Sequence, residues 1–171
     1  MKKNEKHLKV INAALFTVYM LILVWVILFK LQFSLSEIDY TRNVNLIPFH
    51  YSTSVGKQFH IGEIRDNVLI FIPFGIFLSM LAPKMKVQNK LIMMSGTSLA
   101  FEIAQYVLAI GGTDITDVMS NTLGGAVGLA LYALFLKIVK NRQTANVIIS
   151  VIAGCVTISF LGLVVVLLQS N

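Results

Sequence analysis

Five long apolar runs dominate this sequence and restrict it to a fold that is stable in lipid. A helix needs about 20 apolar residues to cross the hydrocarbon core of a bilayer, and each run is close to that length. Only 13% of the residues are charged, whereas soluble domains carry roughly 25%. The sequence therefore predicts a single all-α membrane domain over residues 1–171, a helical bundle of about five transmembrane helices. The predicted spans are residues 10–29, 64–82, 91–110, 117–136 and 147–168.

The positive charges are unevenly divided between the two sides of such a bundle. The N-terminal tail and the loops after the second and fourth spans carry ten of the 14 Lys and Arg residues, and the other side carries four. Loops rich in Lys and Arg favour the cytoplasmic side, which predicts a cytoplasmic N-terminus and an extracellular C-terminus. The net charge of +6 is thus explained by membrane topology, and we expect no nucleic acid as a partner.

Acidic and amide residues gather at three places near the predicted outer surface. Spacings of three and four residues put the members of each group on one face of a helix. If the second, third and fourth spans pack as neighbours, the three groups reach a similar depth. They are Glu63, Asp66 and Asn67 in the second span, Ser98, Glu102 and Gln105 in the third, and Asp114, Asp117 and Asn121 around the start of the fourth.

Several of these residues also have a purely structural interpretation. Asp66, Asp114 and Asp117 lie at predicted helix starts, where a carboxylate caps free N–H groups and meets the positive end of the helix dipole. Asn67 and Asn121 could link helices by hydrogen bonds. Because three helices would present such groups at one level, we predict that the cluster as a whole is functional.

Glu102 is the hardest of these residues to explain structurally. A carboxylate within a span costs about 2.5 kcal/mol or more, and such residues are by default candidates for a functional site. We expect it to be protonated, or paired with Arg65 or a bound cation. The candidate catalytic residues are Asp66, Glu102, Asp114 and Asp117, and the candidate substrate-binding residues are Asn45, Arg65, Asn67, Gln105 and Asn121.

Carboxylate and amide oxygens suit hard cations such as calcium or magnesium. The spacing here matches no closed metal motif, so we predict no cofactor, and a divalent cation is the weaker alternative. General acid–base chemistry is a further use of the same groups.

Two other features concern helix packing. Gly124 and Gly128 form a G-x-x-x-G pattern, which predicts close contact within the chain or, alternatively, a dimer face. Pro73 removes a backbone hydrogen bond inside the second span, so a neighbouring group must satisfy a carbonyl there. The long segment of residues 30–65 contains the apolar stretch 46–49, and we expect it to lie across the outer end of the bundle.

Four blocks of this sequence resemble the VanZ-like family of small bacterial membrane proteins. The resemblance extends over roughly residues 45–136, and the first and fifth spans share only hydrophobicity. Family members often have an arginine shortly before the first acid of the last block, where this chain has Gly111, Gly112 and Thr113, so Arg65 is the candidate replacement. The blocks are NLIPF at 45–49, DNVLIFIPFG at 66–75, EIAQ at 102–105 and TDITDVMSNTLGG at 113–125, followed by Gly128.

The resemblance implies low-level resistance to the glycopeptide teicoplanin, without the altered peptidoglycan terminus that defeats vancomycin. It also implies a multi-pass protein of the bacterial plasma membrane, with membrane lipids and a glycopeptide or lipid-linked envelope precursor as partners. Two alternatives stay open from the sequence. One is an envelope hydrolase or transferase acting on a lipid-linked cell-wall substrate or lipid headgroup. The other is a transporter or an accessory subunit of an unidentified protein.

Overall fold

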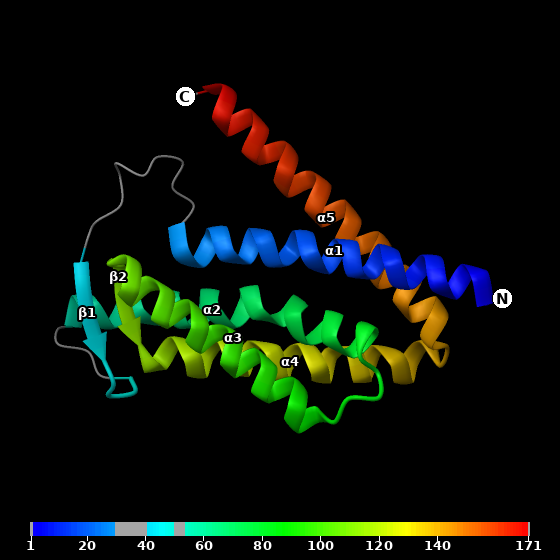
Figure 1. Ribbon diagram of the computed structural model, residues 1–171, viewed down its shortest axis with the longest axis horizontal. Helices are drawn as coiled ribbons and strands as arrows, with labels where there is room; N and C mark the ends of the chain where they lie inside the picture. The colour runs from blue at the N-terminus through cyan, green and yellow to red at the C-terminus, as the bar shows by residue number, and fades with distance from the viewer. Residues whose placement is uncertain (1, 30–40, 50–53, 171) are drawn as a thin grey trace.

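The computed structural model describes residues 2–29, 41–49 and 54–170. Within them it contains five helices, each long and apolar enough to cross a membrane (Figure 1). The prediction of an all-α membrane bundle with five transmembrane helices is therefore confirmed. The elements are α1 (Lys2–Phe29), β1 (Thr41–Asn45), α2 (Ser54–Leu81), α3 (Val87–Leu108), β2 (Ile110–Asp114), α4 (Ile115–Val139) and α5 (Arg142–Ser170).

Helices α2 and α4 form the tightest contact of the bundle, and glycines make it possible. A Cβ atom at Gly124 would overlap the carbonyl oxygen of Val68, and one at Gly128 would overlap that of Ile72. Gly75 of α2 faces the backbone of Gly125 in the same way. The G-x-x-x-G pattern thus serves packing within the chain, and a Cβ at either of its glycines would meet α2 backbone instead of a second copy.

Helix α1 crosses α2 at the level of Pro73. The hydroxyl of Tyr19 donates a 2.7 Å hydrogen bond to the carbonyl of Ile70, three residues before the proline. Helix α2 runs continuously through Pro73, although proline has no N–H and its ring crowds the preceding turn. Pro73 leaves the carbonyl of Leu69 without its intrahelical donor. The Tyr19 bond to the next carbonyl, that of Ile70, links α1 to α2 beside this position.

Replacing Tyr19 with phenylalanine should lower the stability of the bundle by about 1 kcal/mol, because one net hydrogen bond is lost. Denaturation of the purified protein in detergent would measure this. A matched control is Thr17→Val, because the Thr17 hydroxyl bonds only to the Ala13 carbonyl within α1. Equal stability of the Tyr19→Phe variant and the wild type would show that the interhelical bond is unimportant.

A short parallel pair of strands joins two loops at one end of the bundle. β1 pairs with β2 in a register that sets Asn45 opposite Asp114. The third span was expected to reach residue 110, but α3 ends at Leu108, and Ala109 adopts a left-handed backbone with φ of 57°. The chain then extends as β2. The sequence did not predict this strand pairing.

The start of α2 also differs from the expectation. The helix begins at Ser54, before the apolar run, because the intervening polar residues include no proline and a helix can continue above the lipid. Asp66 consequently lies well inside α2 and does not cap its start, so the capping interpretation of this residue is wrong. Helices α1, α4 and α5 contain the other three predicted spans and are each longer than the span predicted.

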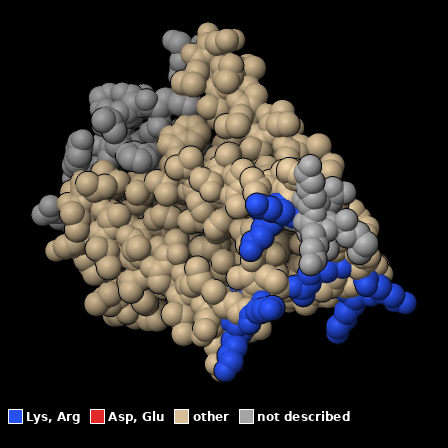
Figure 2. Space-filling model, turned by 45° about the vertical axis from the view of Figure 1, so that its right-hand side comes forward, with Lys and Arg blue, Asp and Glu red and all other residues tan. Residues whose placement is uncertain are grey.

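The two ends of the bundle differ in charge. The start of α1 and the α2–α3 and α4–α5 connections meet at one end, which we call the basic end (Figure 1). Figure 2, which brings that end forward, shows Lys and Arg side chains there and no acidic side chain among the residues that the structure describes. The strands and the starts of α2 and α4 lie at the opposite end. The arrangement has the charge asymmetry expected from the sequence, and the prediction that the basic end is cytoplasmic follows from it.

Candidate functional site

Asp114 is the centre of a hydrogen-bonded network at the strand end of the bundle. Its Oδ1 accepts a 2.7 Å hydrogen bond from the backbone N–H of Thr116, so it caps α4. Its Oδ2 accepts a 3.0 Å hydrogen bond from the side-chain amide of Asn45. One carboxylate thus fixes both the start of α4 and the end of β1, and it combines the capping role with a link between segments.

Glu102 joins this network from α3. Its side chain is only 2% exposed, and its Oε2 accepts a 2.9 Å hydrogen bond from the backbone N–H of Asp114. The hydroxyl of Thr113 donates to the carbonyl oxygen of Glu102 at 3.1 Å. The end of β2 therefore covers the Glu102 carboxylate. This carboxylate in turn holds Asp114, the last residue of β2, against α3.

Asn67 and Asp117 link α2 with α4. The amide of Asn67 donates a 2.8 Å hydrogen bond to Oδ1 of Asp117, which lies in the first turn of α4. Deeper in the bundle, the amide of Asn121 donates to the hydroxyl of Ser98 at 2.8 Å. The structure thus brings together polar groups of all three helices, as their sequence spacing suggested.

Gln105 extends the polar region toward the first helix. Its amide donates a 3.0 Å hydrogen bond to the carbonyl of Ile27 in α1. Within the described part of the chain, the side-chain oxygens of Gln105 and Asn121 are buried and accept no hydrogen bond. An unpaired buried acceptor lowers stability, so these two oxygens are acceptor sites that the described residues leave unused.

Arg65 and Asp66 lie apart from this network. They form an exposed ion pair with a distance of 2.8 Å between the guanidinium and the carboxylate. Arg65 therefore pairs with its chain neighbour, so one of the three alternatives given for Glu102, pairing with Arg65, is wrong. The reason is helical geometry, because Arg65 is about 200° around α2 from Asn67, which faces α4.

The network also contains residues to which the sequence assigned no role. The hydroxyl of Thr116, 3% exposed, accepts a 3.1 Å hydrogen bond from the backbone N–H of Phe49. Thr113 and Thr116 each directly precede an aspartate in the block at 113–125. This repeated Thr-Asp pair is the signal that could have identified them. Thr116 holds the 45–49 segment onto the start of α4, whereas Thr113 bonds to the backbone of Glu102 in α3.

An exposed apolar segment lies beside these polar groups. Leu46 is 70% exposed, and Ile47 and Phe49 are more than half exposed. We call residues 46–49 the apolar tip. Its backbone is anchored by bonds to Asn45 and Thr116, which leaves its side chains facing outward. Such residues are suited to contact with lipid chains at the membrane interface.

The carboxylates of this site accept bonds from the protein itself. Among the described residues, no group of three or more His, Cys, Asp and Glu is placed to hold a metal ion. Glu102, Asp114 and Asp117 each accept an N–H donor instead. We define the outer network as these three acids together with Asn45, Asn67 and Thr116.

Comparison with known proteins agrees with the four sequence blocks. A family model described as VanZ/LLP1 matches residues 16–136, which include every residue of the outer network. Protein VanZ of Enterococcus faecium is 42% identical over 145 residues, covering 84% of this chain and 86% of that protein. No solved structure matches the chain. The chain therefore belongs to the VanZ-like family of membrane proteins.

Proposed function

We propose that this protein protects a bacterial cell against glycopeptide antibiotics from within the plasma membrane. Its family membership and its similarity to Protein VanZ support glycopeptide resistance as the function. The finer part of the proposal is that the antibiotic is acylated, as teicoplanin is, and that the protein acts at the outer face of the membrane.

The observation that carries this proposal is the contact between the outer network and the apolar tip. Residues 45–49 hold both parts together, because Asn45 bonds to Asp114 while Leu46 and Ile47 are largely exposed. An acyl-bearing glycopeptide, or a lipid-linked envelope precursor, has a polar head and an apolar chain. The half-buried groups of the network would meet the head, and the tip would meet the chain.

Burial of Glu102 favours binding over catalysis at this site. At 2% exposure, with its Oε2 held by the Asp114 N–H, it could not reach a headgroup unless β2 moved away. We infer that Glu102 positions Asp114, and that Asn67, Asp114 and Asp117 are the groups a ligand would contact. An envelope hydrolase or transferase has correspondingly less support.

Expression in a glycopeptide-susceptible host tests the proposal. The wild-type protein should raise the inhibitory concentration of teicoplanin more than that of vancomycin, because only teicoplanin carries an acyl chain. The Leu46→Ser and Ile47→Ser double variant should lose most of this protection at normal protein abundance. A matched control is Ile92→Ser, because Ile92 is 69% exposed on α3, away from the tip.

Unchanged teicoplanin susceptibility with abundant wild-type protein would contradict the proposed function. Equal protection by the tip variant and the wild type would contradict the role of the apolar tip while leaving resistance itself supported. Equal protection against both drugs would remove the argument from the acyl chain.

A further inference from the structure

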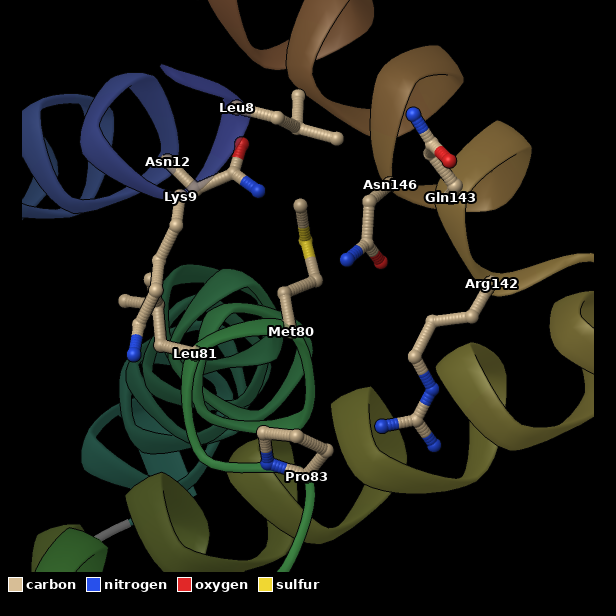
Figure 3. A pocket seen from close by; sticks show the side chains of 9 residues that line it. All are labelled: Leu8, Lys9, Asn12, Met80, Leu81, Pro83, Arg142, Gln143 and Asn146. Carbon is tan, nitrogen blue, oxygen red and sulfur yellow. The ribbon is translucent and has the colours of Figure 1, made fainter. Parts of the chain in front are cut away.

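A cavity at the basic end of the bundle lies far from the outer network. It has a volume of about 350 Å³ and opens between the first turns of α1, the last residues of α2 and the start of α5 (Figure 3). This volume falls in the range of small-ligand pockets, roughly 300–1,000 Å³. Its lining residues are Leu8, Lys9, Asn12, Met80, Leu81, Pro83, Arg142, Gln143 and Asn146.

The charges around this cavity are all positive among the described side chains. Lys9 of α1 and Arg142 of α5 stand on opposite sides of it (Figure 3). The described carboxylates, from Glu63 to Asp117, belong to the strand end, and the described residues include no ion pair for Lys9 or Arg142. Two cations thus border one space, and no carboxylate among the described side chains lies beside them.

Two asparagines add fixed hydrogen-bond donors to the cavity. The side-chain oxygen of Asn12 accepts from the hydroxyl of Ser150, and that of Asn146 accepts a 2.8 Å bond from the hydroxyl of Tyr132. These bonds fix the orientation of both amide groups. The two amide nitrogens, which are donors, point toward the space between α1, α2 and α5 (Figure 3). Asn12 is only 2% exposed, so this arrangement is built into the fold.

We propose that this cavity binds the phosphate of an anionic phospholipid headgroup. Phosphate oxygens accept hydrogen bonds and carry negative charge, which matches a wall of ammonium, guanidinium and amide donors. Basic pockets between helices at a membrane surface are suited to anionic headgroups. A phospholipid fits better than free phosphate, because Leu8, Met80 and Leu81 line the same space and the cavity lies at an end of a membrane-spanning bundle.

Native mass spectrometry of the full-length protein tests this proposal with phosphatidylglycerol and phosphatidylcholine of identical chains. The wild type should retain phosphatidylglycerol preferentially. Arg142→Gln should weaken this binding about fivefold, as expected for one basic group near a lipid surface. Lys137→Gln is the matched control, because Lys137 belongs to the same end but does not line the cavity.

A second variant tests the same cavity independently, in case Arg142→Gln does not fold. Asn146→Asp keeps the oxygen that Tyr132 bonds but replaces the amide donor by a carboxylate oxygen, so it should also weaken phosphatidylglycerol binding. Absence of a preference for phosphatidylglycerol, or an equal loss in Lys137→Gln, would overturn the proposal. Displacement of the lipid by inorganic phosphate alone would assign the cavity to free phosphate and overturn the lipid assignment.

Discussion

Gly128→Ala is expected to destabilise the protein, although alanine is the better helix former. In an unobstructed helix this change stabilises by up to about 1 kcal/mol. Here the added methyl group would overlap the carbonyl oxygen of Ile72 in α2, and backbone cannot rotate away as a side chain can. Overpacking of this kind costs about 1–3 kcal/mol. We therefore expect the sign of the usual effect to reverse.

Two other glycines provide a direct comparison in the same protein. A Cβ atom at Gly96 of α3 or Gly154 of α5 would meet no atom within 4 Å. Gly96→Ala and Gly154→Ala should leave the stability in detergent unchanged or raise it. If Gly128→Ala behaved as these two do, the close α2–α4 contact would be contradicted. The comparison needs no knowledge of function, so it tests the fold by itself.

The hydrogen bond between Asn45 and Asp114 is expected to be lost when either residue is changed alone. It should form again when the two residues are exchanged, with Asp at 45 and Asn at 114. Asn45→Asp would place two carboxylates face to face, and Asp114→Asn would place two amide groups there. Each change removes a hydrogen bond to a charged group, worth about 1.5–3 kcal/mol. The double variant should restore the bond in reverse, because the new amide at 114 can donate to the new carboxylate at 45.

The double variant also preserves the neighbouring contacts. An asparagine at 114 retains an oxygen to cap α4 through Thr116, and an aspartate at 45 retains the acceptor for the Ile47 N–H. Stability in detergent and teicoplanin susceptibility should both fall in the single variants and recover in the double variant. If the double variant recovered neither property, the losses in the single variants would not arise from the bond between Asn45 and Asp114.

The sequence predicts the helices and the convergence of their polar faces because both depend on local patterns. A run of apolar residues long enough to cross a bilayer can hardly form anything but a helix in lipid. The spacing of Asp117 and Asn121 then fixes which face of α4 they share. The only nonlocal assumption was that α2, α3 and α4 are neighbours, and the bonds from Asn67 and Asn121 support it.

The remaining features depend on contacts between distant parts of the chain. The pairing of β1 with β2 joins segments about 70 residues apart, and neither strand has the alternating apolar pattern that identifies a strand in a sequence. Charge alone makes Arg65 one candidate partner for Glu102, whereas in the structure Arg65 pairs with Asp66, its neighbour in the sequence. Charge identifies candidate partners, and the geometry of the helix selects among them.

The strand pair also sets the order in which the outer network is assembled. β1 precedes α2 in the chain and β2 follows α3, so two membrane crossings are synthesised between the paired segments. Asn45 is therefore synthesised well before Asp114. The bonds that join Asn45 to Asp114 and Phe49 to Thr116 can form only after α3 has been synthesised and α4 has begun. The outer network is thus complete only when α2, α3 and the start of α4 are all in place.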